Sequence, residues 1–383
     1  MKILMIAPEP FFEPRGTPFS EYYRLQALSA LGHQVDLVTY PIGEDRPMPG
    51  LRIIRTFRPP GIRAVKTGPS AVKLVLDFFL FARAIGRGLC RRYDLVHTHE
   101  EGCLPGMIVA RLKGIPHLYD MHSSLVQQLD NFEFSRSALV RGVFGWLERT
   151  TLRSASSVIV ICRSLFDHAR TQTDERKVTL IENFMEDRPV LDPARTERVR
   201  SEVGGAGRKV ILYAGTLEAY QGIPLLLESV RLLPPEFLLV IVGGKPSQVE
   251  AARRQAEALG VAERVCLTGQ KPQADIPYYM AVADVLVSPR SAGTNIPLKI
   301  YSYLRSGIPV VATDLPTHTQ TLTRDISLLA EPRAEPFAAA IVAAAGEEGR
   351  RVAGAAVRFC AEHYAPERYR TLVARALECA TSA

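Results

Sequence analysis

The chain has 383 residues, of which 47% are hydrophobic and 23% are charged, so it is long enough for two domains with separate cores. No apolar run reaches the ~18 residues that a membrane-spanning helix needs, which excludes such a helix. The net charge is +7, but the sequence has no nucleic-acid-binding motif and no aromatic-interleaved basic strip. We therefore expect no nucleic acid as a partner.

The cysteines and the start of the chain bear on the cellular compartment. The six cysteines are scattered without paired metal-ligand spacing, which favours a reduced, cytoplasmic protein. The opening MKILMIAP is apolar for only a few residues before Glu9 and Pro10, and it has no cleavage-site pattern. It therefore predicts a first β-strand rather than a signal peptide.

Short apolar runs alternate with helical patterns through the first half of the chain. Strands are predicted at Lys2–Ala7, Gln34–Tyr40, Arg52–Phe57, Asp94–His99, His117–Met121 and Ser157–Cys162. The helices predicted between them include Ser20–Leu31, Ala71–Cys90 and Ser137–Ser154. Continuous apolar strands separated by helices are typical of a parallel sheet that is covered on both faces.

One segment of this half is strongly basic. Between Arg52 and Arg92 the chain has ten Lys or Arg residues and one acid, Asp77. Within it, LVLDFFLFARAIGRGLC mixes large apolar side chains with Arg83 and Arg87. Residues 52–92 could make peripheral contact with an anionic membrane, at the inner face of the cell membrane, or meet a polyanionic acceptor. The alternative is a core helix with a solvated basic face.

The second half of the chain repeats this alternation. Its predicted strands are Lys209–Ala214, Leu238–Val242, Arg264–Thr268, Asp284–Ser288 and Ile308–Thr313. Between the halves, Phe184–Gly207 is rich in Pro, Gly and charge, as expected of a linker, and we place the domain boundary near Met185. A last helix is predicted after Pro366.

The stretch GTNIPLKIYSYLRSGIPVVATD predicts a polar loop, a helix from near Pro297 to Gly307, and a buried strand. Proline suits the first turn of a helix, where its missing N–H would be unpaired in any case. Free N–H groups at a helix N-terminus attract phosphate, and Lys299 adds a mobile cation one turn into this helix. The stretch therefore predicts a diphosphate site.

This order of loop, helix, Ser-Gly and Pro-Val-Val-Ala-Thr resembles the donor-site signature of retaining glycosyltransferases with the GT-B fold, especially family 4. The resemblance implies an α/β protein with two Rossmann-like domains that face each other across a cleft. Residues 1–185 would form the acceptor-side domain and residues 186–364 the nucleotide-sugar donor domain. Residues 365–383 would form a C-terminal helix that crosses back to the first domain.

The sequence departs from the family at four donor positions. The two usual glutamates fall on Thr294 and Ser302, and two cations that normally hold the diphosphate are replaced by Thr216 and Gln221. A branch of the family resembles this variant and keeps Lys299. These four residues are still expected to bind the donor. The other residues expected to bind it are Gly16, Gly215, Gly243, Gly244, Lys245, Gln270, Lys271, Arg290, Asn295, Ile296 and Pro297.

In the first half, His122 follows a predicted strand, and ligands of open α/β sheets bind beyond the carboxyl ends of the strands. The resemblance places a histidine here against the donor sugar, so His122 and Lys299 are the expected catalytic residues. His97 and His99 share a strand face and could, with Glu100, suggest a metal. No third ligand is apparent, and we assign no metal.

The loop after the first strand is a further candidate for binding. It contains Gly16, whose lack of a side chain would let backbone N–H groups approach a bound oxygen closely. We expect Ser20 to cap the helix that follows.

The resemblance implies transfer of a sugar from a nucleotide-sugar donor, UDP- or GDP-linked, to a glycan, lipid-linked or small-molecule acceptor with retention of configuration. No Asp-x-Asp occurs, so we expect no metal and no further cofactor, and Lys299 with backbone N–H groups would meet the diphosphate charge. The alternative is a non-catalytic GT-B protein that binds a nucleotide or a glycan, which the neutral Thr216, Gln221, Thr294 and Ser302 favour. A different enzyme on the same fold is a third hypothesis.

Overall fold

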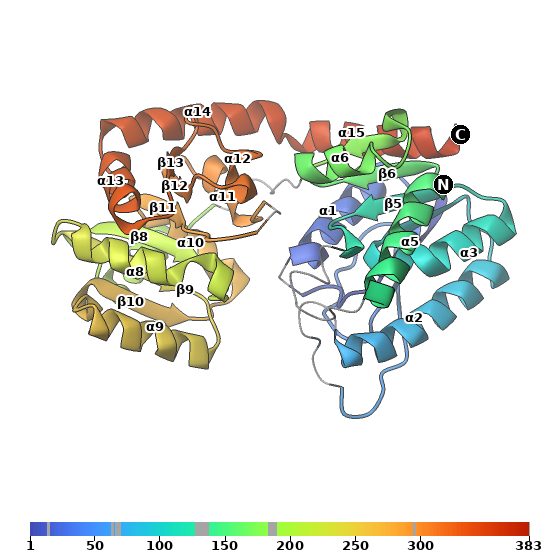
Figure 1. Cartoon of the computed structure of the whole chain (residues 1–383), viewed down its shortest axis with the longest axis horizontal. Coiled ribbons are helices and arrows are strands. Elements are labelled where there is room, and N and C mark those ends of the chain that lie inside the picture. The colour runs from blue at the N-terminus through green and yellow to red at the C-terminus, as the bar shows by residue number, and fades with distance from the viewer. Residues whose placement is uncertain are drawn as a thin grey trace. The chain divides into compact units, whose positions relative to one another are not determined.

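The structure, a computed structural model, describes residues 1–13, 16–62, 65, 70–126, 138–182, 190–293 and 296–382. The chain divides into two compact units, one with Met1–Phe184 and Pro366–Ala383 and the other with Met185–Ala365. Each unit is built on one parallel sheet with helices packed around it (Figure 1).

The first unit has a seven-stranded parallel sheet in the order β3-β2-β1-β4-β5-β6-β7. The strands are β1 (Lys2–Ala7), β2 (Gln34–Thr39), β3 (Leu51–Arg55), β4 (Leu95–His99), β5 (His117–Met121), β6 (Ser157–Val160) and β7 (Val178–Leu180). Every residue of β4 and β5 is buried, as expected for strands that are covered on both faces.

Helices cover this sheet and complete its core. They are α1 (Gly16–Ala30), α2 (Ala71–Cys90), α3 (Cys103–Lys113), α5 (Ala138–Ser154), α6 (Arg163–Ala169) and α15 (Pro366–Thr381). Leu76 and Leu80 of α2 pack with Leu4, Ile6 and Val38 of the first two strands.

The predicted return of the C-terminal helix to the first unit is confirmed. Pro366 opens α15, which packs on α1 and β6. The guanidinium carbon of Arg24 lies 5.3 Å from the centre of the Tyr369 ring. The last helix is therefore part of the first unit although it follows the second unit in the sequence.

The second unit has a six-stranded parallel sheet in the order β10-β9-β8-β11-β12-β13. The strands are β8 (Lys209–Ala214), β9 (Phe237–Val242), β10 (Val265–Gly269), β11 (Val285–Ser288), β12 (Val310–Thr313) and β13 (Leu328–Ala330). The helices are α7 (Pro193–Glu202), α8 (Ile223–Leu232), α9 (Pro246–Ala258), α10 (Ile276–Ala281), α11 (Lys299–Arg305), α12 (Pro316–Thr319), α13 (Ala334–Ala344) and α14 (Glu347–His363).

In both sheets the strand order reverses at one point. This point lies between β1 and β4 in the first unit and between β8 and β11 in the second. Ligands of open α/β sheets bind at such switch points, beyond the carboxyl ends of the strands. The fold thus provides one candidate location in each unit.

Several predicted boundaries are wrong by a few residues. The helix expected near Pro297 begins at Lys299, because the Ile300 N–H donates to the Pro297 carbonyl and closes a tighter turn first. The following strand begins at Val310, since the Ile308 N–H is held in the turn by Ser306 Oγ. Ser20 does not cap α1, which already begins at Gly16.

Candidate active site

In the second unit, three of the predicted site residues meet at the switch point: Gly215 and Arg290, predicted to bind the donor, and Lys299, predicted to be catalytic. Gly215 directly follows β8, Arg290 follows β11, and Lys299 is the first residue of α11. A Cβ on Gly215 would lie 3.4 Å from Lys299 Nζ, so the backbone approaches the lysine closely. These residues come from three separate segments, and only the fold brings them together.

Tyr213, the penultimate residue of β8, is the centre of this group, and the sequence analysis missed it. Its hydroxyl donates to the Thr216 carbonyl at 2.6 Å and lies 3.1 Å from Gln221 Oε1. Gln221 Nε2 in turn lies 3.5 Å from Thr216 Oγ1. At two of the four unusual donor positions, the Gln221 side chain and the main-chain carbonyl of Thr216 therefore hold the Tyr213 hydroxyl in place.

Lys299 lies on the ring that this network fixes. Its Nζ is 3.7 Å from the centre of the Tyr213 ring, is buried, and has no hydrogen-bond partner among the described residues. Burial, followed by the charge of Arg290, lowers the pKa of Lys299 well below its ordinary value. The prediction of a mobile cation one turn into the helix is therefore wrong, because the lysine stands at the helix start and is held by an aromatic face.

Arg290 adds a second cation to the same place. Its Nη1 donates to Thr317 Oγ1 at 2.9 Å, and its guanidinium carbon lies 5.3 Å from the centre of the Tyr220 ring. Burial lowers the pKa of Arg290 from its ordinary value. Two cations kept from water in one unit make this end of the sheet attractive to an anion.

The glycine pair after β9 permits close packing of two loops. Gly243 has φ 125°, and a Cβ there would lie 2.0 Å from the Gly215 carbonyl oxygen. Gly244 has φ 87°, and its Cβ would lie 2.5 Å from Leu217 Cδ1. Only glycine fits these positions, which lets the loops after β8 and β9 run against each other.

The remaining predicted donor residues of the second unit differ in their surroundings. Lys245 is an exposed residue before α9, with Nζ 3.5 Å from Glu218 Oε1, and Ser302 donates its hydroxyl to the Lys299 carbonyl at 2.8 Å. The other four that can be placed are Gln270 and Lys271 beyond the edge strand β10, half-buried Ile296 and buried Pro297. Thr294 and Asn295 lie outside the described residues.

In the first unit, His122 follows β5 and is buried. Its Nε2 lies 3.2 Å from Asp120 Oδ1 and 3.3 Å from His99 Nδ1. Burial by itself would lower the pKa of His122, but the Asp120 carboxylate, with smaller effects of Glu100 and Glu9, raises it above its ordinary value. A positively charged imidazole is therefore favoured at this position.

Asp120 is held by several groups at once. Arg24 Nε donates to Asp120 Oδ2 at 2.8 Å, and His97 Nε2 lies 3.4 Å from the same oxygen. Although His97, His99 and Asp120 could together provide metal ligands, the Arg24 guanidinium already neutralises the carboxylate. We therefore assign no metal to this cluster.

Buried acids surround His122, and the sequence analysis did not identify them as a group. Burial raises the pKa of Glu9 to about 7 and that of Glu100 to about 8. Next to Glu100, the Glu101 carboxylate is contacted by Lys73 Nζ at 2.8 Å. These residues stand after β1 and β4 at the first switch point, where only the fold makes them neighbours. Gly16 opens α1 near this edge, and residues 14 and 15 of its loop lie outside the described ranges.

Comparison with known proteins agrees with this architecture. The family described as Glycosyl transferase 4-like domain matches residues 24–183, and the family described as Glycosyl transferases group 1 matches residues 208–346. Together the two matches cover well over half of the chain. They fall on the first and second units respectively.

Individual relatives are glycosyltransferases by name. A 2-deoxystreptamine N-acetyl-D-glucosaminyltransferase of Streptomyces fradiae is 29% identical over 86% of this chain and 83% of its own length. A 2-deoxystreptamine glucosyltransferase of Streptomyces kanamyceticus is 26% identical over 57% of this chain and 59% of its own length. Anabaena HepE, solved with UDP and in another crystal with UDP-glucose, is 18% identical, with a TM-score of 0.77 over 99% of this chain and 100% of the solved one.

The fold, with two parallel-sheet α/β units of this topology, is that of the GT-B class, as the resemblance implied. The chain belongs to the GT-B glycosyltransferases, in the families described as Glycosyl transferases group 1 and Glycosyl transferase 4-like domain.

Proposed function

We propose that this protein transfers a sugar from a UDP-sugar to a hydroxyl group of a glycan, a lipid-linked or a small-molecule acceptor, with retention of anomeric configuration and without a metal ion. The HepE complexes favour UDP over GDP as the nucleotide of the donor. The two Streptomyces relatives, whose names specify 2-deoxystreptamine, favour a polyhydroxylated acceptor. A cytoplasmic location is part of this proposal.

The observation that carries the proposal is the position of Lys299. Its buried Nζ lies on the Tyr213 ring without a hydrogen-bond partner among the described residues, next to the Gly215 backbone. A diphosphate placed there would supply the missing acceptor oxygens and would make the charged lysine favourable. As the bond to the sugar breaks, negative charge grows on the diphosphate, and Lys299 and Arg290 stabilise it.

His122 is the proposed sugar contact of the first unit. Asp120 favours its charged form, so its ring can donate a hydrogen bond to a sugar hydroxyl. Asp120 itself is fixed by Arg24, which holds the histidine in one position. His122 is thus proposed to orient the donor sugar rather than to act as a nucleophile.

The non-catalytic alternative is not favoured. It was suggested by the neutral Thr216, Gln221, Thr294 and Ser302. The Gln221 side chain and the main-chain carbonyl of Thr216 instead support the hydroxyl of Tyr213, whose ring carries Lys299. The matched families and the named relatives are transferases as well.

The test is donor binding followed by product analysis. Thermal shift with UDP-, GDP-, ADP- and TDP-sugars in the presence of a chelator should give the largest increase in Tm with a UDP-sugar. Lys299→Ala should abolish that increase. Lys209→Ala is the matched control, because Lys209 also lies over a ring, that of Phe237 at 5.2 Å, but at the opposite end of β8.

NMR of the purified product tests the stereochemistry. A product with the same anomeric configuration as the donor supports retention, whereas an inverted product contradicts it. If no donor changes Tm while the protein still unfolds cooperatively, the proposed transferase function is wrong.

A further inference from the structure

Residues 122–125, which we name the His122 segment, directly follow β5 and are held by buried acids. Asp120, in β5 itself, contacts the ring of His122, with Oδ1 3.2 Å from Nε2. Ser123 Oγ donates to both oxygens of the Glu100 carboxylate, at 3.1 and 3.0 Å. The first half of the segment is therefore held by acids from β5 and from the turn after β4.

The second half of the His122 segment is held by Glu148 of α5, which the sequence analysis did not single out. Its Oε2 accepts the Leu125 N–H at 2.7 Å, and the Ser124 side chain also hydrogen-bonds the carboxylate. Glu148 and Leu125 are both buried. A buried carboxylate is costly unless hydrogen bonds satisfy it. Two of the residues that satisfy this one belong to the segment that carries the proposed sugar contact.

His168 of α6 holds the same carboxylate from another side. Its Nε2 lies 2.8 Å from Glu148 Oε1, and this hydrogen bond raises the pKa of His168 above its ordinary value. Burial by itself would raise the pKa of Glu148, but the hydrogen bonds from His168, Ser124 and Leu125 lower it below its ordinary value. A charged carboxylate is therefore favoured at Glu148, and α5 and α6 together brace the His122 segment.

The basic segment of residues 52–92 takes no part in this brace. Lys73 and Arg87 of α2 are paired with acids inside the unit, and most exposed residues of the helix are apolar, with Phe78 at 68% exposure. The predicted core helix is confirmed by its buried residues, but its predicted solvated basic face is wrong. No helix in the described ranges is long and apolar enough to cross a bilayer.

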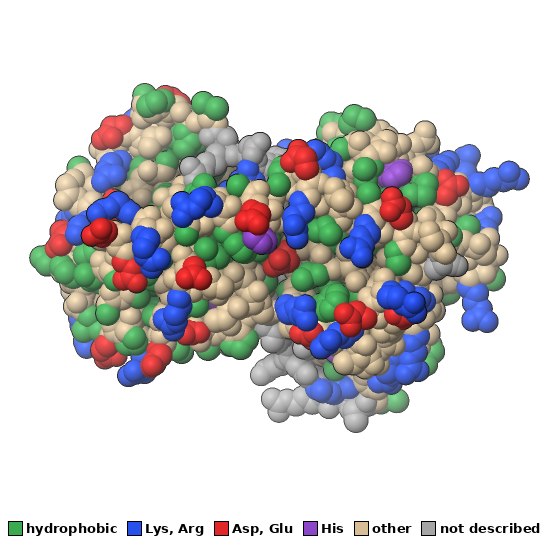
Figure 2. Space-filling view, turned by 90° about the horizontal axis from the view of Figure 1, so that it is seen from above, with side chains coloured by type: hydrophobic (Ala, Val, Ile, Leu, Met, Phe, Trp, Pro, Cys, Tyr) green, Lys and Arg blue, Asp and Glu red, His purple; other side chains and the backbone are tan. Residues whose placement is uncertain are grey.

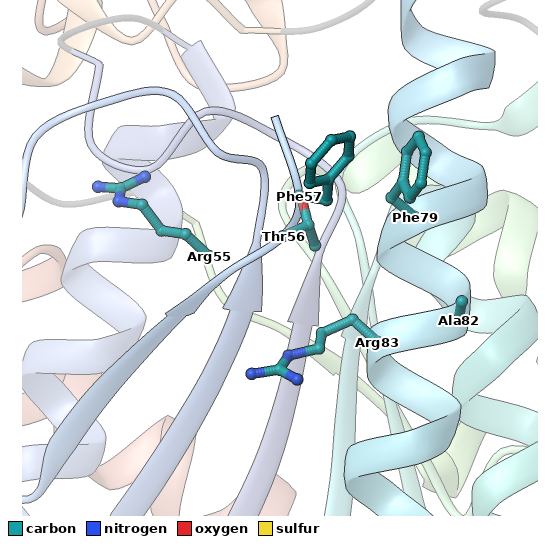
Figure 3. A pocket seen from close by; sticks show the side chains of 6 residues that line it. All are labelled: Arg55, Thr56, Phe57, Phe79, Ala82 and Arg83. Atoms are coloured by element: carbon teal, nitrogen blue, oxygen red, sulfur yellow. The ribbon is translucent and has the colours of Figure 1, made fainter. Parts of the chain in front are cut away.

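An open cavity of about 510 Å³ lies between the end of β3 and α2 (Figure 3). It is lined by Arg55, Thr56, Phe57, Phe79, Ala82 and Arg83, none of which is an acid. The rings of Phe57 and Phe79 lie next to each other, with centres 5.1 Å apart. Because β2, β1 and β4 separate β3 from β5 in the sheet, this cavity provides no acceptor for the His122 segment.

Exposed charges are a weak substitute for the buried contacts. On the face of the molecule in Figure 2, Lys and Arg are mixed with Asp and Glu, so their fields partly cancel. Salt also screens exposed charges beyond about 10 Å. The position of the His122 segment therefore depends on its buried hydrogen bonds.

We propose that Glu148, braced by His168, is a positioning residue that fixes the His122 segment and thereby the imidazole that orients the donor sugar. This role depends on the proposed function, which makes His122 the sugar contact. Without the carboxylate, the Leu125 N–H and the Ser124 side chain lose their acceptor, and the segment can move. A displacement of about 1 Å at such a contact can lower the rate about a hundredfold.

The test follows UDP release from UDP-glucose. Glu148→Ala should lower kcat about tenfold to a hundredfold, whereas the increase in Tm that UDP causes should stay at its wild-type value, because the proposed nucleotide contacts lie in the second unit. Glu148→Gln, whose amide oxygen can still accept the Leu125 N–H, should regain most of kcat. His168→Ala keeps the carboxylate without its outer partner and should lower kcat about threefold.

NMR of the His122 ring reports on the segment without any turnover. The pKa of His122 should fall in Glu148→Ala, because a displaced ring moves away from the Asp120 carboxylate that raises this pKa. His168→Ala, in which the Leu125 hydrogen bond remains, should show a smaller fall, and this variant carries the test if Glu148→Ala does not fold.

Asp94→Ala is the matched control. Asp94 Oδ2 also accepts a main-chain N–H, that of Lys2 at 2.6 Å, but at the start of β1, the opposite end of the same sheet. This variant should keep the kcat and the His122 pKa of the wild type.

A wild-type kcat and a wild-type His122 pKa in Glu148→Ala would overturn the proposal, and so would equal changes in Asp94→Ala. If the wild-type protein releases no UDP from UDP-glucose, that result bears on the proposed function alone. The pKa of His122 in Glu148→Ala then decides, since a fall supports the positioning role and an unchanged value overturns it.

Discussion

The Nζ of Lys299 lies 3.7 Å from the centre of the Tyr213 ring, although the two residues belong to different elements of the second unit, α11 and β8. The ring offers a partial negative face to the lysine, but it cannot accept a hydrogen bond as a phosphate oxygen does. Burial keeps the pKa of Lys299 well below its ordinary value. The surroundings of Lys299 therefore disfavour its charged form in the free protein, and a bound anion would favour that form.

Donor binding should be coupled to proton uptake at this lysine. Because the pKa of Lys299 is lowered in the free protein and a diphosphate would raise it, protons are taken up at pH values between the free and bound pKa. The affinity for UDP should fall as the pH rises through that window. Calorimetry in buffers of different ionisation enthalpy measures the uptake.

Lys299→Met should remove the proton uptake and weaken UDP binding about tenfold to a hundredfold, the value of one charge-assisted contact. Lys209→Met serves as the control and should retain both the proton uptake and the affinity for UDP of the wild type. Unchanged proton uptake in Lys299→Met would show that another group titrates.

Gly243→Ala should destabilise the second unit and weaken donor binding. The new Cβ would lie 2.0 Å from the Gly215 carbonyl oxygen, so the loop that carries Gly215 must move. We expect a loss of more than about 2 kcal/mol in the free energy of unfolding. Gly260→Ala isolates the effect of positive φ, because Gly260 has φ 68° and open space around its Cβ. Gly260→Ala should lower the free energy of unfolding by about 1 kcal/mol. If denaturant titrations give the same loss for Gly243→Ala and Gly260→Ala, the steric explanation is wrong.

Asp120→Asn should destabilise the first unit by about 3–5 kcal/mol, because it leaves the Arg24 guanidinium buried without its counter-charge. The pKa of His122, which the Asp120 carboxylate raises, should fall in the same variant. Denaturant unfolding and an NMR titration of the His122 ring measure the two effects. The exposed pair of Asp314 and Arg324 provides a control, and Asp314→Asn should leave the unfolding transition unchanged.

Stability should decrease as the pH rises through the window set by Glu100. Burial, followed by the charge of Glu101, raises the pKa of Glu100 from 4.5 to about 8. Between these values the unfolded chain releases a proton that the folded protein keeps, so the free energy of unfolding falls by at most about 1.4 kcal/mol per pH unit for this group.

Glu100→Gln imitates the protonated acid. Between about pH 5 and about pH 8, the Tm of this variant should fall less than the Tm of the wild type. The same pH dependence in variant and wild type would mean that Glu100 is ionised in the folded protein throughout this range.

The elements of this fold could be predicted largely from local pattern. Four elements have the bounds that the sequence predicted: the strands Lys2–Ala7, His117–Met121 and Lys209–Ala214 and the helix Ala71–Cys90. Long apolar runs and regular helical spacing are properties of neighbouring residues, so they predict an element without knowledge of its long-range contacts. The short strands β7 and β13 were missed because three residues are too few to show a period.

The family signature between Gly293 and Asp314 also identified the class and pointed to Lys299, and the resemblance of earlier segments pointed to Gly215 and Arg290. The sequence could not predict what these residues contact. Tyr213 has the apolar pattern of a core strand residue, and nothing local indicates that its ring receives a lysine from α11. Likewise Arg24 and Asp120 are 96 positions apart in the chain.

The sequence by itself determined the two-domain parallel architecture, because periodicity and turn residues are local, and the family resemblance pointed to the place where we propose the donor site. Only the tertiary structure decided the chemical state of the site. Burial, ion pairing and the close approach of Lys299 to Tyr213 arise from segments that meet when the sheets form. These long-range contacts set the pKa values and the charges available to a ligand.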